Sequence, residues 1–468
     1  MLYTISKRLF LILPGILLFI NVQAQQKILS MKDAEQTALN NYAGIKAKAN
    51  QLNSSKAYLT ETKTEYLPDV NLSAQQVYGT VNSQFGPLSG YHGLATAASG
   101  PILANQNWNA AFGSLYVTNV NWDFFAFGRA KEKVGVQKRI VDLNTTDLTQ
   151  EQFEEQVRVA SAYLNVLVAQ QLAKAQQDNL KRSTDLQTVV IARVKNGLNP
   201  GVDSSLANAE VSNARIALTN ALQVVQDQSN QLAQYLGIAP QDFVLDSTFV
   251  SKVPNNIYVQ PGIKPEEHPV LQYYRDRIGV SDEQAKYLST FSYPTFSLFG
   301  LFQGRGSGFN AGYGQSNLND YSSSYGAGAN PSRYNYLLGV GVIWNITNPF
   351  RVHYQVESQK FTSQQYQDEY DLVDQQLHDQ QVLAESKISS AVKNNNEAPV
   401  EVKAANDAYN QKFTLYKNGL ANIVDFTQAL YTLNRADVDQ AIASNNVWQA
   451  LLYKSAATGD FGIFINNF

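Results

Sequence analysis

The sequence predicts a mainly α protein with a small β part, in which one structural unit occurs twice. Two helical segments of unusual length and four segments of alternating polarity predict this fold class. The third observation is an internal duplication, because short motifs recur in one register without a gap. The recurring pairs are Lys195-Asn196-Gly197-Leu198 with Lys417-Asn418-Gly419-Leu420, Val202-Asp203 with Val424-Asp425, Trp122 with Trp344, and Gly237 with Gly459.

Composition excludes several classes of protein. Only 16% of the residues are charged, the formal net charge is -3, and no basic stretch predicts binding to nucleic acid. Because the chain has no cysteine, disulfides, thiolate metal sites and a lipid-modified N-terminal cysteine are excluded. The four histidines (His92, His268, His353 and His378) lack metal or catalytic spacing, and no glycine-rich phosphate loop follows a strand. We expect no enzyme activity, no metal and no cofactor.

The N-terminus has the pattern of a secretory signal peptide over residues 1–24. Lys7 and Arg8 are followed by an apolar run over residues 9–20 and by the small-residue cleavage site Val22-Gln23-Ala24. The mature chain is expected to begin near Gln25, outside the cytoplasm. No later segment is long and apolar enough to predict a membrane-spanning helix.

The first helix is expected from Ser30, which can cap its first turn, to about Tyr66. Pro68 ends it, and a strand follows in which apolar residues alternate with polar ones. A second strand precedes Trp122. A third follows Pro294, and a fourth runs from about residue 334 to 346. The segments 79–109 and 304–333 lack periodicity and predict exposed, mobile loops.

The long helices are expected from about Arg129 to Lys195 and from about Arg351 to Lys417, each on the order of 100 Å long. Pro399 should kink or break the second one. Gly197 and Gly419 predict helix ends, after which Asp203 and Asp425 open the return helices. The first return helix has a heptad seam that includes Val211, Leu218, Val225 and Leu232; in the second, Ala436, Ala443, Ala450 and Ala457 allow close helix approach.

Four amphipathic strands are too few to close a barrel, since roughly eight are needed. Sheet edges cannot stay unpaired in lipid, so the strands must be pooled across subunits. The helices far outrun a bilayer and must pack in water as antiparallel hairpins. We expect a first repeat over 25–245, a linker over 246–268, a second repeat over 269–460 and a tail over 461–468.

With these elements in place, the sequence resembles the TolC-type outer-membrane efflux protein family (outer membrane factors). The matching stretches are Leu29-Ser30-Met31-Lys32-Asp33-Ala34, Asn40-Asn41-Tyr42, Tyr66-Leu67-Pro68-Asp69-Val70, Trp122 through Gly128-Arg129, Asn196-Gly197-Leu198 with Val202-Asp203, and Tyr416-Lys417-Asn418-Gly419 with Ile423-Val424-Asp425. Each motif is weak alone, but their order and duplication are specific.

The resemblance implies a homotrimer with a shared twelve-strand barrel in the outer membrane and a twelve-helix tunnel (an α-barrel with coiled-coil packing) in the periplasm. Its function would be that of a passive exit duct in a tripartite efflux or type I secretion system. An inner-membrane pump and a periplasmic adaptor would supply energy and selectivity. A surface or periplasmic coiled-coil protein is the alternative, although it does not require matched return turns. A diffusion porin would need a complete barrel per chain.

The resemblance also implies a gate at the hairpin tips. Tyr416 and Asp425 match a gating tyrosine and an aperture aspartate, and Asp203 matches an acid that takes part in closing contacts. Ala421 and Gln428 depart from the family pattern, since a basic residue and a second aperture carboxylate are expected there. For Asp203 and Asp425, capping of the return helices is an equally weighted reading.

The tips and the strand ends supply the remaining candidates. Adaptor contact is expected at the hairpin tips, although a helix-capping role accounts for both glycines without a partner. The tip residues are Lys195, Gly197, Leu198, Lys417, Gly419 and Leu420. Trp122 and Trp344 are expected to anchor the barrel at the membrane interface, with packing at the barrel–tunnel junction as the alternative. Phe468 is not favoured as a barrel-assembly signal, because the residues before it continue a helix.

Overall fold

The computed structural model describes residues 28–83, 102–247, 253–254, 257 and 264–468. The expected signal peptide and the centre of the first loop therefore lie outside the described residues. The helices are α1 (Met31–Asn41), α2 (Ala43–Thr64), α3 (Arg129–Lys195), α4 (Gly201–Tyr235), α5 (Pro269–Ser289), α6 (Tyr325–Ala329), α7 (Asn348–Lys417), α8 (Ile423–Thr458) and α9 (Gly462–Ile465), with 3-10 turns η1 (Pro265–Glu267) and η2 (Thr290–Ser292). The strands are β1 (Asp69–Thr80), β2 (Ala110–Phe125), β3 (Thr295–Ser307) and β4 (Arg333–Ile343).

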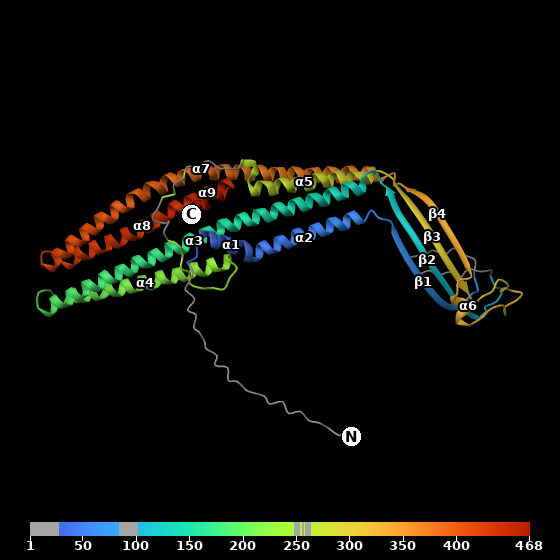
Figure 1. Cartoon of the computed structure of the whole chain (residues 1–468), viewed down its shortest axis with the longest axis horizontal. Coiled ribbons are helices and arrows are strands. Elements are labelled where there is room, and N and C mark those ends of the chain that lie inside the picture. Colours follow the sequence, from blue (N-terminus) through green and yellow to red (C-terminus); the bar gives the residue numbers. More distant parts are fainter. Residues whose placement is uncertain (1–27, 84–101, 248–252, 255–256, 258–263) are drawn as a thin grey trace, which may run out of the picture.

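The molecule is long and narrow, with the sheet at one end and the tips of two helical hairpins at the other (Figure 1). One hairpin is α3 with α4, and the other is α7 with α8. Their return helices are about half as long as α3 and α7. The return helices do not reach the sheet. Beside the parts of α3 and α7 that lie nearest the sheet, α1, α2 and α5 pack in their place. No described helix combines the length and apolar character needed to cross a bilayer.

The sheet is antiparallel, and its strands lie in chain order β1-β2-β3-β4. Its register puts the predicted apolar residues on one face, as the pairs Val70–Val120, Leu298–Val340 and Phe302–Tyr336 show. This apolar face is exposed in the single chain at Val70, Leu72, Tyr78, Leu298, Phe302, Tyr334, Tyr336, Leu338, Val340 and Val342. The other face carries most of the polar residues of the strands, together with apolar residues such as Leu115, Leu301 and Leu337. Among the described residues, β1 and β4 each have one edge that pairs with no further strand of the sheet.

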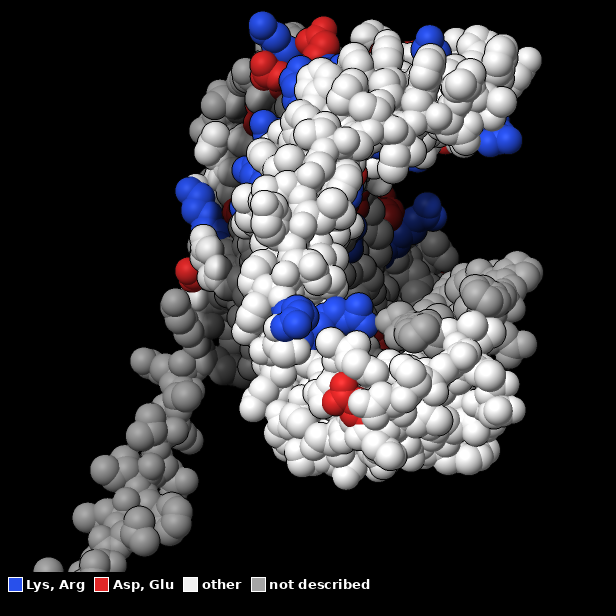
Figure 2. All heavy atoms as spheres, turned by 90° about the vertical axis from the view of Figure 1, so that its right-hand side faces the viewer, with Lys and Arg blue, Asp and Glu red and all other residues white. Residues whose placement is uncertain are grey.

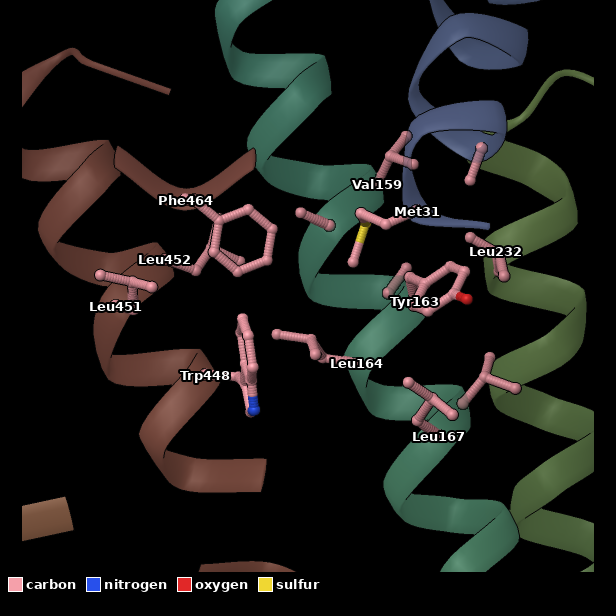
Figure 3. Close-up of a cluster of buried hydrophobic side chains, with 14 of the residues drawn as sticks. Met31, Val159, Tyr163, Leu164, Leu167, Leu232, Trp448, Leu451, Leu452 and Phe464 are labelled. Atoms are coloured by element: carbon pink, nitrogen blue, oxygen red, sulfur yellow. The ribbon is translucent and has the colours of Figure 1, made fainter. Parts of the chain in front are cut away.

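The main core lies where α1, α3, α4, α8 and α9 meet (Figure 3). Met31, Tyr163, Leu232 and Trp448 point into it from four helices and are almost completely buried. Fully burying a side chain of this size contributes roughly 1.5–3 kcal/mol. The tail completes this core, since the Phe468 ring lies 4.9 Å from the Trp448 ring. The C-terminus thus ends in helical packing rather than in a strand.

Small residues let the helices pack closely in both hairpins. The seam predicted in α4 is buried or half-buried throughout its length. In α8 the four predicted alanines, Ala436, Ala443, Ala450 and Ala457, are all buried. α3 contacts α8 as well as α4, so the two hairpins of one chain pack side by side.

Several details differ from the sequence predictions. The first helix is split at Tyr42 into α1 and α2, although the Ser30 hydroxyl caps it as expected by accepting from the Asp33 amide at 3.1 Å. α7 continues through Pro399 without a break, because the tertiary contacts of so long a helix outweigh one lost hydrogen bond. β4 ends at Ile343, before Trp344.

The second loop is also more ordered than predicted. It contains α6, and a cluster of aromatic rings from Phe309, Tyr313 and Tyr321 holds its base together. α6 packs on β2 and β3, where Tyr116 donates a hydrogen bond to the Ala329 carbonyl at 3.1 Å. Lack of periodicity therefore did not mean lack of structure here, because single aromatic and glycine contacts carry no periodic signal.

Candidate gate at the hairpin tips

Both hairpins end in the same glycine-capped turn. Gly197 and Gly419 adopt the left-handed conformation, with φ of 74° and 73°. The amide of Leu198 donates to the Arg193 carbonyl, and the amide of Leu420 donates to the Leu415 carbonyl, each at 2.9 Å. This is the Schellman arrangement, which satisfies carbonyls left free at a helix end. The predicted capping role of the two glycines is therefore present in the structure.

The aspartates do not cap the return helices. The N-cap of α4 is Pro200, and the N-cap of α8 is Asn422, whose side chain accepts from the Asp425 amide at 2.8 Å. Asp203 and Asp425 lie in the first turn, where a negative charge is favoured by the helix dipole. The capping interpretation of both aspartates was wrong, since each helix begins earlier than the predicted cap.

Asp203 and Tyr416 are joined through Asn199. The Asn199 side-chain amide donates to Asp203 Oδ2 at 2.7 Å and to the Tyr416 hydroxyl at 3.3 Å. Arg193 completes the set by donating from Nε to Asn199 Oδ1 at 2.7 Å and from Nη1 to the Lys417 carbonyl at 2.8 Å. We call these four residues, Arg193, Asn199, Asp203 and Tyr416, the tip network. It ties the first hairpin to the second.

Tyr416 is held on its other side by aromatic packing. It is only 1% exposed, and its ring stacks on Phe426 at 5.9 Å between centroids. Phe426 in turn contacts Tyr409 and Phe413. Burial raises the pKa of Tyr416, and the nearby Asp203 raises it further. Tyr416 therefore stays a neutral phenol, fixed by packing and able to exchange hydrogen bonds.

Asp425 and Gln428 lie apart from the tip network. Both are exposed in the single chain, and the Asp425 carboxylate faces Lys412 at 3.4 Å. The tip residues Leu198 and Leu420 are 65% and 74% exposed, and Lys195 and Lys417 are also exposed. The Lys417 ammonium lies 4.3 Å from the centre of the Phe413 ring.

Arg193 and Asn199 were missed by sequence reasoning, although a signal for them existed. They stand where the two repeats differ, since Leu415 and Ala421 occupy the corresponding positions of the second repeat. Two further contacts join the hairpins nearer the middle. Arg182 pairs with Asp437 at 2.9 Å, and Tyr431 donates to Glu210.

The two tryptophans make equivalent contacts at the junction between helices and sheet. The Trp122 indole donates to the Tyr66 carbonyl at 2.8 Å, and the Trp344 indole donates to the Ser292 carbonyl at 3.2 Å. Each acceptor lies two residues before the proline that precedes a strand. This geometry fits packing at the junction between helices and sheet. It also places both indoles at the helix-proximal end of the sheet, where β1 and β3 begin and β2 and β4 end.

No group of three metal-ligating side chains comes together within the described ranges.

The chain was compared with known protein families, curated proteins and solved structures. Residues 34–238 match the family model described as outer membrane efflux protein. No curated protein matches the chain in sequence.

Solved structures match over most of the chain. The outer membrane protein VceC of Vibrio cholerae is 16% identical, with a TM-score of 0.69 over 92% of this chain and 96% of that one. CusC is 13% identical, with a TM-score of 0.74 over 92% of both chains. The CmeC outer membrane channel of Campylobacter jejuni is 13% identical, with a TM-score of 0.71 over 92% of this chain and 85% of that one.

The fold is therefore the one found in solved outer-membrane channels that have a long helical part. The resemblance found in the sequence is confirmed, because the first repeat matches the family model of outer membrane efflux proteins and the whole fold is that of such channels.

Proposed function

We propose that three copies of this chain form one continuous exit duct through the outer membrane and across the periplasm. The observation that carries this proposal is the open sheet: four strands in chain order, with free edges on β1 and β4 and an apolar face exposed to solvent. An unpaired backbone group in lipid costs several kcal/mol. Pairing β4 of one copy with β1 of the next removes both edges and gives a barrel of twelve strands.

The helical part supports the same assembly. α3 and α7 have 67 and 70 residues, which corresponds to roughly 100 Å each. Their largely polar exposed faces suit water rather than lipid. Two hairpins from each of three copies would supply the wall of a tunnel that continues the barrel. Each copy would thus contribute two equivalent hairpins, in agreement with the duplication in the sequence. We propose that the two repeats span 25–245 and 269–460 and are joined by the linker 246–268.

We propose that the tip network is the latch of the closed duct. It fastens the second hairpin to the first through Asn199 and Arg193. Opening would require Tyr416 and Asn199 to separate, after which the hairpins could move apart. Asp425 and Gln428, which are exposed on α8, would line the narrow aperture around the threefold axis.

Groups at the hairpin tips and at the junction between helices and sheet fit the two remaining roles, which are adaptor contact and membrane anchoring. The exposed tips around Leu198 and Leu420 suit a periplasmic adaptor, which would couple the duct to an inner-membrane pump. Reversing the charge of Lys195 and Lys417 should weaken cross-linking to the adaptor, whereas intact cross-linking would contradict the assignment. We further propose that Trp122 and Trp344 sit at the periplasmic membrane interface, where amphipathic rings are favoured.

The decisive experiment measures mass and conductance of the same preparation. The protein is extracted in detergent, its mass is determined by native mass spectrometry, and it is then inserted into planar bilayers. A trimer that conducts ions supports the duct. A monomer, or a trimer that never conducts even when the tip network is disrupted, would favour a structural coiled-coil protein instead.

A further inference from the structure

The outer end of the sheet carries two arginines on adjacent strands, directly opposite each other. Arg305 of β3 pairs with Arg333 of β4 in the register of the sheet. They are the only Lys or Arg residues in the segments 68–128 and 294–347. Like charges directly opposite in an antiparallel pair are destabilising. An arrangement of this kind is expected to have a compensating partner.

That partner is not found among the described residues. Neither arginine forms an ion pair there, and the side chain of Arg333 donates only to the neighbouring Ser332 carbonyl. Asp320, in the same loop region, is occupied, since its carboxylate accepts from Asn310 at 2.8 Å and from the Gly312 amide at 3.0 Å. The sequence between 84 and 101 contains no acidic residue that could neutralise the pair.

The register shows which face of the sheet carries the pair. Gln75, Leu115, Arg305 and Arg333 form one row across the four strands. The next row towards the helices ends in the pair Gln303–Asn335, so this is the polar face. α6 covers the opposite face, where Tyr325 donates to Gln76 at 2.6 Å. In the proposed barrel the polar face lines the lumen.

A hollow accompanies the two arginines. A cavity of about 830 Å³ at this end of the sheet is lined by both, together with Gln75, Ser332 and Asn335. Figure 2 views this end of the molecule, where one basic patch lies near the centre with an acidic group below it, among side chains that are mostly uncharged, and further Lys and Arg side chains lie around the periphery. Charge, donors and space are therefore present at one place.

We propose that Arg305 and Arg333 form an anion-binding site at the outer mouth of the duct. This rests on the proposed trimer, in which six guanidinium groups would form a ring. Guanidinium groups bind phosphate and carboxylate in a bidentate manner. The site would take solutes or ions that carry several phosphate or carboxylate groups, and it would hold them in the lumen at the point of exit.

The test uses tripolyphosphate as the probe and the full-length trimer in planar bilayers. Tripolyphosphate added to the side that faces the barrel should reduce the conductance, and added potassium chloride should relieve the block, because salt screens the attraction. The double variant Arg305→Gln/Arg333→Gln should need at least tenfold more tripolyphosphate for half block. Arg351→Gln, which removes an exposed arginine at the start of α7, is the matched control and should behave like wild type.

Calorimetric titration of the detergent-solubilised trimer with tripolyphosphate provides a second measurement that does not depend on conductance. Equal block and equal heats in wild type and the double variant would overturn the anion site while leaving the duct intact. Absence of any conductance would instead count against the duct, and the titration would still decide whether the arginines bind the anion. The double variant Arg305→Lys/Arg333→Lys should retain part of the binding, because it keeps the charge but loses the bidentate geometry.

Discussion

The Tyr416 hydroxyl lies 3.3 Å from the side-chain nitrogen of Asn199, and this contact joins two hairpins that are far apart in the sequence. The same nitrogen donates to Asp203 at 2.7 Å. One amide thus satisfies a phenol and a carboxylate at once. Tyr416 and Phe426 both belong to the second hairpin, so movement of that hairpin away from the first breaks this hydrogen bond and can leave the aromatic stack intact.

Asn199→Ala should favour the open state of the duct. The change removes all three hydrogen bonds of the side-chain amide, including the one that Tyr416 accepts. A loss of about 1–2 kcal/mol shifts a two-state equilibrium by roughly 5–30-fold. Single-channel conductance in planar bilayers should increase. Asn418→Ala is the control, because Asn418 bonds only within its own helix to the Thr414 carbonyl. Equal conductance of wild type and Asn199→Ala would exclude the latch.

Asp425→Asn should weaken block of the duct by divalent cations. Three copies of Asp425 would face one axis in the trimer, and the neighbouring Gln428 adds no charge. Loss of this ring should raise the half-blocking concentration of a divalent cation, added from the tip side, by roughly tenfold, which corresponds to about 1.4 kcal/mol. Asp407→Asn, an exposed change farther along α7, serves as the control. Unchanged cation block in Asp425→Asn would contradict the placement of Asp425 in the aperture.

Gly197→Ala should loosen the tip of the first hairpin. Its φ of 74° is strained for alanine by about 1–2 kcal/mol, although no other atom obstructs a new Cβ. Amide hydrogen exchange at residues 193–203 should therefore become faster. Gly201→Ala, at the start of α4 where φ is not positive and the space is also open, should leave exchange unchanged or slower. If amide hydrogen exchange at residues 193–203 were not faster in Gly197→Ala, the turn would have to adopt another conformation.

Glu155→Gln should change how stability depends on pH. Glu155 is completely buried, and burial raises its pKa to about 7 although Arg158 lies 3.3 Å away. The folded chain therefore holds a proton that the unfolded chain has released between about pH 4.5 and 7. Stability contributed by this group is present below pH 4.5 and is lost as the pH rises to 7.

The loss across that window amounts to about 3 kcal/mol per chain at 1.36 kcal/mol per pKa unit. Glu155→Gln should abolish this slope and raise the melting temperature at pH 8, while Arg158 keeps Glu151 at 2.7 Å. Glu154→Gln is the control, because the side chain of Glu154 is partly exposed, whereas that of Glu155 is fully buried. The melting temperature of the solubilised trimer is measured at pH 4.5 and 8. An equal change in melting temperature between these pH values in wild type and Glu155→Gln would contradict the burial argument.

Local patterns predicted the elements because their causes are local. The alternation after Pro68 and before Trp344 predicted strands, and the register then placed those apolar residues on one face. The glycines of the return turns predicted left-handed caps, which both adopt. The predictions failed where several contacts compete, as at Pro399, which does not break α7, and at Asp203 and Asp425, where Pro200 and Asn422 are the N-caps instead.

The sequence alone determined that the chain is a duplicated helical hairpin with strands too few to close a barrel, because periodicity and strand count are properties of the chain. Only the tertiary structure decided which side chains meet. Arg193 and Asn199 reach the second hairpin, and Arg305 lies opposite Arg333, because packing brings together residues with large sequence separations. Such contacts depend on strand register and helix rotation, which no short stretch of sequence encodes.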